Sequence, residues 1–228
     1  MVVHPAHRGR GIESELLDTV VTQIAHEGGG SAVLWVLGAD EADDDAVAAA
    51  GFQRQRDLLE MRAPLPPAQV PEWPGGIETR TFVPGQDDTA WLEVNNRAFA
   101  GHPEQGSWDA GTLRRRIAEP WFDPAGFVLA FDDRGLTGFC WTKVHPPEPG
   151  GEEQFGEIYV IGVDPSHHGG GLGRALTLAG LTSLAERGVR TGMLFVDGAN
   201  EAAVNLYRSI GFETVRRDRA YAREVAPA

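Results

Sequence analysis

The chain has 228 residues, of which 42% are hydrophobic and 23% charged, so it is long and apolar enough to fold around a sizeable core. Its formal net charge of −13 argues against a nucleic-acid partner, because binding to phosphates needs an excess of Lys and Arg on one face. The single cysteine, Cys140, excludes an internal disulfide, and the absence of a signal peptide or a long apolar run predicts a soluble, cytoplasmic protein with no membrane partner.

The chain contains two copies of one module, which are found by searching for internal repeats. When the sequence is shifted by 160 positions, residues 3–52 align with residues 163–212 without a gap and with 17 identities. Strands and helices are predicted ahead of the second copy, whereas almost nothing precedes the first. We therefore expect a C-terminal half module followed by a complete module. An incomplete N-terminal sequence or a misplaced start codon would explain this order, whereas a half module that folds alone would leave an open sheet edge.

Hydrophobic periodicity and turn residues divide the chain further. We predict a truncated first module over 1–62, a Pro- and Gly-rich linker over 63–75 and a complete second module over 76–228. The predicted elements of the second module are, in chain order, a strand (77–82), two helices (86–100, 108–119), three strands (127–132, 136–144, 154–163), a helix (171–187), a strand (191–196), a helix (201–210) and a strand (212–225). This order describes an α/β (α+β) fold, in which helices flank a mixed sheet.

A glycine-rich loop joins one of these strands to the next helix, in the stretch VIGVDPSHHGGGLGRAL (160–176). Glycine permits positive φ, and successive N–H groups at a helix N-terminus suit a phosphate or pyrophosphate. Glycine also serves tight turns, so the loop alone is weak support for a ligand. A Walker loop is excluded because no Lys follows the glycines, and a dinucleotide-binding loop would open a βαβ unit rather than come late in its domain.

The loop and the segment NEAAVNLYRSIGF (200–212) together resemble the GNAT acetyltransferase superfamily. The resemblance implies the GNAT acyl-CoA N-acyltransferase fold, with acetyl-CoA as the co-substrate and its pyrophosphate in the loop. His168 stands where the family usually has Gln or Arg, which weakens a side-chain contact but leaves the backbone N–H groups available. The cofactor-binding positions that the resemblance implies are Ile161, Gly162, Val163, His168, Gly169, Gly170, Gly171, Leu172, Gly173, Arg174, Asn200, Glu201, Ala202, Ala203, Val204 and Asn205.

Four further segments resemble the tandem mycothiol synthase family of actinobacteria: NNRAFAGHPEQGSW (95–108), EPWFDPAGF (119–127), GFCWTKVHP (138–146) and GEIYVIGVDP (156–165). This resemblance implies transfer of acetyl to the cysteinyl amine of a cysteine–glucosamine–inositol conjugate, the last step of mycothiol biosynthesis. Two alternatives stay open. One is a GNAT enzyme for another small-molecule or peptide amine, and the other is a non-enzymatic acyl-CoA-binding protein inactivated by truncation.

Acetyl transfer to an amine needs a base for the amine proton and an acid for the departing thiolate. Glu157, in the strand that leads into the loop, is the candidate base, and Tyr207 is the candidate acid. An exposed strand Glu and a core helical Tyr are the structural alternatives for these two residues. The acceptor contacts that the resemblance implies are Glu104, Lys143, Glu157 and Phe195, with Phe195 in a position where a Tyr is expected.

The first copy has lost residues that this chemistry requires. The counterparts of Tyr207, Gly173 and Asn200 are Val47, Glu13 and Asp40. A carboxylate in the phosphate loop would repel phosphate, so we predict that the first module is non-catalytic, being either structural or a vestigial cofactor site, and that the second is catalytic. The histidines lack metal-ligand spacing, so we predict no metal. We expect a monomer whose partner is the small-molecule amine.

Overall fold

The structure, a computed structural model, describes residues 4–7, 10–101, 105–147 and 154–228. Its elements are, in chain order, η1 (Pro5–His7), α1 (Ile12–His26), β1 (Gly30–Val36), α2 (Glu41–Ala49), β2 (Gln53–Pro64), β3 (Glu78–Thr81), α3 (Asp88–Ala98), α4 (Ala110–Ile117), η2 (Pro124–Gly126), β4 (Phe127–Asp132), β5 (Gly135–His145), β6 (Phe155–Val163), η3 (Pro165–His167), α5 (Leu172–Glu186), β7 (Thr191–Asp197), α6 (Glu201–Ile210) and β8 (Glu213–Val225). All the helices and strands predicted between residues 77 and 225 are present, with ends within two residues of the predicted ones. In the described residues, no helix is long and apolar enough to cross a membrane.

The repeat in the sequence is also a repeat in the structure. α1 covers residues 12–26 and α5 covers residues 172–186, which are the same positions after the shift of 160. Both helices follow a glycine in the left-handed region, with φ 83° at Gly11 and φ 84° at Gly171. Glycine adopts this conformation without the steric cost that a Cβ brings, so both copies start their helix with the same backbone geometry.

The chain forms two compact units, and the first takes residues from both copies. It comprises the described residues up to Glu60 together with Val196–Glu201 and Thr214–Ala228. Its strand order is β1-β8-β2, and β8 runs antiparallel to β1 along the whole length of β1. Its buried core consists of Ala32, Val47, Phe52, Tyr221 and Val225.

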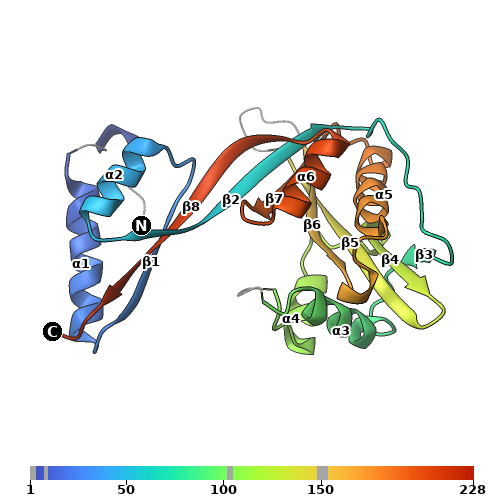
Figure 1. Cartoon of the computed structure of the whole chain (residues 1–228), viewed down its shortest axis with the longest axis horizontal. Coiled ribbons are helices and arrows are strands. Elements are labelled where there is room, and N and C mark those ends of the chain that lie inside the picture. Colours follow the sequence, from blue (N-terminus) through green and yellow to red (C-terminus); the bar gives the residue numbers. More distant parts are fainter. Residues whose placement is uncertain (1–3, 8–9, 102–104, 148–153) are drawn as a thin grey trace. The chain divides into compact units, whose positions relative to one another are not determined.

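The second unit comprises Met61–Phe195 and Ala202–Glu213. Its strand order is β2-β7-β6-β5-β4-β3, with β6 and β7 parallel and β3 to β6 antiparallel. α5 packs closely on one face of this sheet, where a Cβ added to Gly180 would lie 2.5 Å from Sγ of Cys140. The other face carries an aromatic core that includes Trp91 of α3 and Trp141 of β5. Figure 1 shows α3 and α4 together on this face, opposite α5.

The two copies exchange their last strands. β2 and β8 are counterparts in the repeat, and so are β1 and β7. Nevertheless, β8 lies beside β1 in the first unit, and the end of β2 lies beside β7 in the second. The compact units therefore differ from the contiguous domains expected from the repeat, because the sheet hydrogen bonds follow the exchanged strands.

Cys140 is fully buried on β5, and burial raises the pKa of its thiol to about 12. A thiol in such surroundings is inert. Trp108 and Trp141 are also buried in the core.

Candidate active site

The parallel strands β6 and β7 pair only at their beginning. Their register runs from Phe155↔Thr191 to Glu157↔Met193, although β6 continues to Val163. Beyond Glu157 no further pair with β7 follows in the described part of the chain, while β6 stays paired with β5 as far as Val163. Places where neighbouring parallel strands separate at their carboxyl ends commonly hold ligands in sheets of this kind.

A β-bulge lies at this point of β6. Trp141 pairs with Val160 and Thr142 pairs with Ile158, so Tyr159 is the extra residue of the bulge. Tyr159 and Val160, although adjacent, both pack against the same aromatic core. Bulges are common beside active sites, because they change the direction in which a side chain points.

The glycine-rich loop has the geometry that its residues predict. It enters α5, a helix of 15 residues, through Gly171. Gly169 and Gly171 have φ of 81° and 84°, and a Cβ added to either would meet nothing within 4 Å. There is thus open space beside the loop, and the first N–H groups of α5 have no acceptor within the helix. This arrangement suits an anion such as a pyrophosphate.

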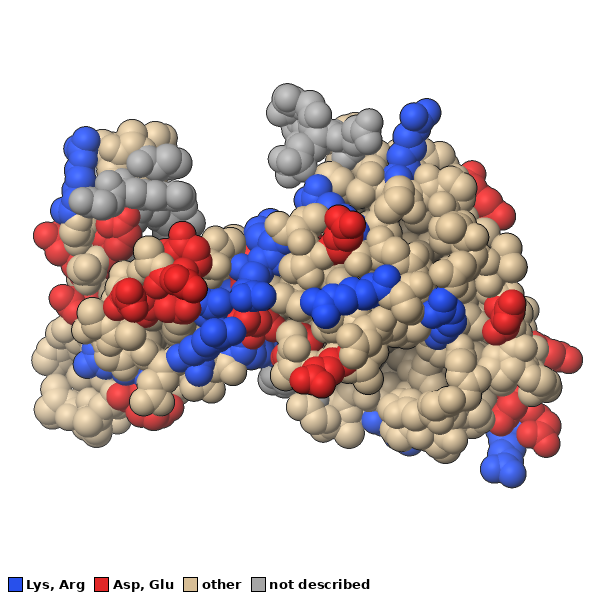
Figure 2. Space-filling model, turned by 45° about the horizontal axis from the view of Figure 1, so that its top comes forward, with Lys and Arg blue, Asp and Glu red and all other residues tan. Residues whose placement is uncertain are grey.

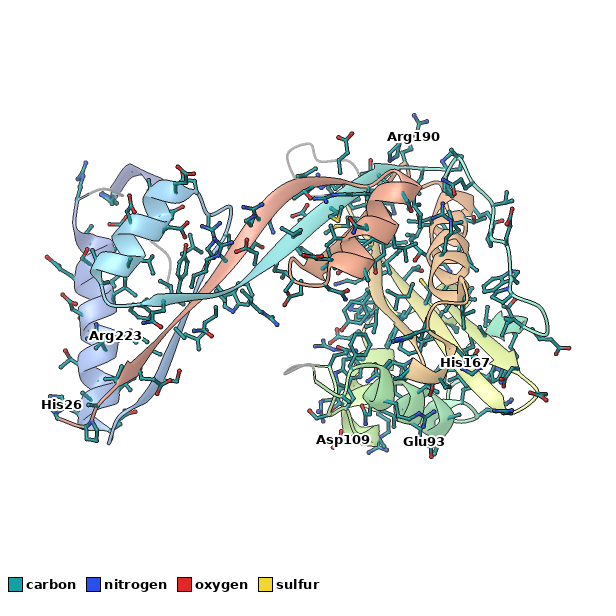
Figure 3. The ribbon with its side chains drawn as sticks, viewed as in Figure 1. His26, Glu93, Asp109, His167, Arg190 and Arg223 are labelled. Atoms are coloured by element: carbon teal, nitrogen blue, oxygen red, sulfur yellow. The ribbon has the colours of Figure 1, made fainter. Side chains whose placement is uncertain are left out.

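Asp164 anchors the start of this loop. One of its carboxylate oxygens accepts hydrogen bonds from the backbone N–H and the hydroxyl of Ser166, at 3.0 and 2.6 Å. The other oxygen accepts a hydrogen bond from Nε of Arg97 in α3, at 2.7 Å. His167, labelled in Figure 3, places Nε2 3.0 Å from the carboxylate of Asp132 at the end of β4. The loop is therefore tied to α3 and to β4.

We expect Asp164→Asn to remove part of the acid sensitivity of the fold. The hydroxyl of Ser166, assisted by Arg97 and opposed by burial, lowers the pKa of Asp164 from 3.8 to about 2. A carboxyl with a lowered pKa stabilises the fold above its unfolded pKa, and this contribution is lost as the pH falls through the folded pKa. The shift corresponds to about 2 kcal/mol, so urea unfolding at pH 7 should show the variant less stable by that amount. The difference should become small near pH 2, and a difference of the same size at both pH values would contradict the explanation.

Glu157 lies where β6 and β7 begin to separate. Its side chain is 13% exposed, and its Oε2 lies 2.7 Å from Nε2 of His145 on β5. Lys143 is its direct neighbour across the strands, with Nζ 4.9 Å from the centre of the Trp121 ring. Phe195, which is 38% exposed, lies two residues beyond the β7 partner of Glu157 and hence on the same face of the sheet. The structure thus brings three of the four predicted acceptor-contact residues to one face.

Tyr207 lies on α6 and is buried. Burial raises the pKa of its phenol above the usual value of 10, so the hydroxyl stays protonated at neutral pH. α6 borders the start of α5 and the end of β6, because a Cβ added to Gly173 would meet Leu206 at 3.9 Å and Val163 at 3.8 Å. The candidate acid is therefore carried by a helix that lies next to the glycine-rich loop.

Comparison with known proteins agrees with this geometry. The Acetyltransferase (GNAT) family matches residues 90–212. The chain is 51% identical to a mycothiol acetyltransferase of Thermobispora bispora over 224 residues, which cover 98% of this chain and 75% of that relative. This chain belongs to the GNAT acetyltransferase family. It is also 46% identical to a mycothiol acetyltransferase of Streptomyces coelicolor, over 98% of this chain and 70% of that protein.

Solved GNAT structures share the fold. A GCN5-related N-acetyltransferase from Sphaerobacter thermophilus superposes with a TM-score of 0.77 at 27% identity, over 99% of this chain and 72% of that chain. A tandem GNAT protein from the clavulanic acid biosynthesis pathway gives a TM-score of 0.71 at 20% identity, over 100% of this chain and 74% of that chain. The predicted GNAT fold is confirmed, and the chain is an acetyl-CoA-dependent N-acetyltransferase.

The loop of this GNAT chain can hold a pyrophosphate in spite of the negative charge of the whole chain. Anion binding at a helix N-terminus uses backbone N–H groups and the helix dipole, so it needs no broad basic surface. In Figure 2, acidic side chains gather on the left-hand part and basic ones toward the middle, while on the right-hand part both kinds are scattered singly. Among the described residues no group of three or more His, Cys, Asp or Glu could hold a metal ion, and the predicted lack of a metal requirement stays a prediction.

Other predicted cofactor-binding residues of the GNAT site have protein partners for their side chains. Nε2 of His168 lies 3.1 Å from the carbonyl oxygen of Val163. The guanidinium of Arg174 donates to the hydroxyl of Ser209 at 2.8 Å and to the side-chain oxygen of Gln69. The loop therefore offers a ligand mainly backbone N–H groups. The binding roles of these residues stay predictions, and Glu104 lies outside the described residues.

The sequence interpretation missed three residues that the structure places at this site, namely Arg97, His145 and Tyr159. Arg97 is 67 positions from Asp164 in the chain, so their ion pair leaves no local pattern. His145 comes directly after the predicted strand 136–144 and two positions after Lys143, and this spacing was a usable signal that both side chains share a face if the strand is one residue longer. The bulge at Tyr159 has no signal of its own, because it is a feature of the register between two strands.

We expect Gly171→Ala to weaken acetyl-CoA binding about five-fold, since a left-handed alanine costs roughly 1 kcal/mol and the loop would move to relieve it. The Kd from isothermal titration and the KM for acetyl-CoA should both rise, with little change in kcat. Gly188→Ala is the matched control, because Gly188 at the other end of α5 has φ 81° and a Cβ there would also meet nothing within 4 Å. Equal losses of affinity in both variants would show that backbone strain, not the loop, is responsible.

Proposed function

We propose that this chain transfers the acetyl group of acetyl-CoA to the cysteinyl amine of the cysteine–glucosamine–inositol conjugate, the last step of mycothiol biosynthesis. The observation that carries the proposal is the identity of 51% and 46% with two mycothiol acetyltransferases over almost the whole chain. The shared face of Lys143 and Glu157 supports it, because a polar sugar conjugate needs charged and hydrogen-bonding contacts next to the reacting amine.

The mechanism follows from the positions of these residues. The glycine-rich loop and the N-terminus of α5 bind the pyrophosphate, which places the thioester where β6 and β7 separate. Glu157 takes a proton from the amine, directly or through a water molecule, as the nitrogen attacks the acetyl carbon. Tyr207 gives its phenolic proton to the CoA thiolate when the C–S bond breaks, which its raised pKa permits at neutral pH. Lys143 and Phe195 contact the acceptor, as does Glu104.

We assign the catalytic role to the second copy of the module, within the proposed boundaries 76–228. In the first copy, Val47 replaces the phenol and is buried in the core of its unit. Asp40, the counterpart of Asn200, accepts a hydrogen bond from the N–H of Asp43 at 3.0 Å and so caps α2. The first copy, 1–62, is thus proposed to be structural, joined to the second by the linker 63–75. A monomeric state and a cytoplasmic location are part of the same proposal.

One assay tests this function. The purified chain is incubated with acetyl-CoA and the cysteine–glucosamine–inositol conjugate, and CoA release and product mass are followed. We expect a product heavier by one acetyl group on the cysteinyl nitrogen. Turnover only with other amines would show that the acceptor is a different small-molecule or peptide amine. Thermal stabilisation by acetyl-CoA without any product would instead indicate a non-enzymatic acyl-CoA-binding protein.

A further inference from the structure

His145 is in close contact with the proposed base. Its Nε2 lies 2.7 Å from Oε2 of Glu157, on the neighbouring antiparallel strand. Lys143 pairs with Glu157 and His145 pairs with Phe155, so His145 and Glu157 are diagonal neighbours on one face of the sheet. The contact uses one oxygen of the carboxylate, which leaves the other oxygen for the amine of the acceptor.

The two side chains differ in their access to solvent. The side chain of Glu157 is 13% exposed, whereas that of His145 is 32% exposed. An imidazole ring can accept a proton at one nitrogen and release one from the other, and its charge changes near neutral pH more readily than that of other side chains. His145 therefore lies between a largely buried carboxylate and water.

The other charged or titratable groups near this pair have different surroundings. Lys143 lies against the ring of Trp121, and the guanidinium of Arg62 on β2 lies 4.2 Å from the centre of the Phe155 ring. Burial raises the pKa of the Tyr159 phenol, with smaller electrostatic effects from Arg116, Glu157 and Glu119. His145 combines a hydrogen-bond contact with Glu157 and partial exposure to solvent.

The proposed reaction releases one proton in each turnover. At neutral pH the acceptor amine is largely an ammonium ion, and it loses two N–H protons when it becomes an amide. Tyr207 supplies one proton to the sulfur of CoA and regains one from water, so the two protons that leave the amine amount to a net release of one proton to solvent. Because Glu157 removes protons from the amine, it must pass one on before it can act again.

We propose that His145 conducts this proton from Glu157 to solvent, an inference that rests on the proposed role of Glu157. The amine N–H bond breaks and its proton goes to the carboxylate. In the resting pair, Nε2–H of the neutral ring donates to the ionised carboxylate. Once the other oxygen of the carboxylate is protonated, exchange with water moves the ring proton from Nε2 to Nδ1, and rotation of the carboxyl group brings its proton to Nε2. The imidazolium ion then releases its Nδ1 proton to water, which leaves Nε2–H facing the carboxylate again. The cycle restores an ionised Glu157 and a neutral His145.

Chemical rescue of the full-length chain tests this proton route. His145→Ala should lower kcat about ten-fold with an unchanged KM for acetyl-CoA, and imidazole added to the buffer should restore kcat in proportion to its concentration. His145→Gln keeps a hydrogen-bond donor but cannot relay a proton, so it should be as slow as His145→Ala. His26→Ala is the control, because His26 is an exposed histidine on α1, far along the chain, and should behave like the wild type (Figure 3).

Each other outcome overturns a defined part of the proposal. A wild-type kcat for His145→Gln would mean that the ring only orients Glu157. A kcat of His145→Ala that does not rise when imidazole is added would likewise exclude a proton relay. Circular dichroism and thermal melting of each variant establish that it is folded. Normal turnover by Glu157→Gln would overturn the role of Glu157 as the base together with the relay. No acetyl transfer by the wild type to any amine would overturn the proposed function itself. If kcat is low for Glu157→Gln but equal to that of the wild type for His145→Ala, the relay alone is overturned.

Discussion

Glu157→Gln should lower kcat for acetyl transfer by about 100-fold or more while the KM for acetyl-CoA changes little. The carboxamide has nearly the same size and can still bond His145, so the fold should be retained, but it cannot accept the amine proton. A free α-amine has a pKa of about 8, so below that value the acceptor depends on the enzyme to lose its proton. The defect should therefore shrink as the pH rises above about 8, where solvent supplies the neutral amine. Steady-state rates from neutral to alkaline pH measure both effects.

A second glutamate on a strand provides the control. Glu78 on β3 is exposed and belongs to the same compact unit, so Glu78→Gln changes the charge of the chain equally without touching the separation of β6 and β7. It should keep the wild-type rate. A Glu157→Gln defect that stays constant with pH would show that the carboxylate binds or orients the acceptor instead of taking its proton.

The elements of this fold could be predicted because local signals agree with one another. Gly11 and Gly171 adopt the left-handed backbone conformation, and a helix begins directly after each of them. The exchange of β2 and β8 could not be predicted in this way. The two strands are counterparts in the repeat, so their residue patterns suit either position in the sheet, and long-range pairing decides between them.

The candidate site was predictable to the extent that it depends on single residues in recognisable segments. Glu157 and Lys143 come from such segments and Phe195 from the predicted strand 191–196, and the structure places all three on one face. The contact between His145 and Glu157 depends on which residues of β5 and β6 lie opposite each other, and the bulge changes that register within the same pair of strands. Sequence alone does not specify a register of this kind, because a shift of one residue exchanges the faces of a strand.

Tyr207→Phe should lower kcat by about 10- to 100-fold and leave the affinity for acetyl-CoA almost unchanged. The substitution removes only the hydroxyl, and the ring keeps its place against Phe212, whose centre lies 5.8 Å from that of Tyr207. Burial raises the pKa of the phenol, so in the wild type the acid stays protonated from neutral to mildly alkaline pH, and its ionisation should not limit the rate there. Replacing the thioester by one with a more acidic thiol should reduce the defect, because such a leaving group needs less help from an acid.

Tyr221→Phe separates this chemical role from the general effect of removing a buried phenol. Tyr221 is buried in the first unit, where its hydroxyl donates to the carboxylate of Asp44 at 2.5 Å. Loss of that hydrogen bond should lower the free energy of unfolding by about 1 to 2 kcal/mol, with no direct effect on the rate of acetyl transfer at a temperature where the variant is folded. An unchanged kcat in Tyr207→Phe would exclude its role as the acid. Tyr207 is carried by the helix that borders the glycine-rich loop, whereas Tyr221 is on β8. Equal losses of kcat in the two variants would therefore mean that Tyr207 affects the rate through the stability of the fold and not as an acid.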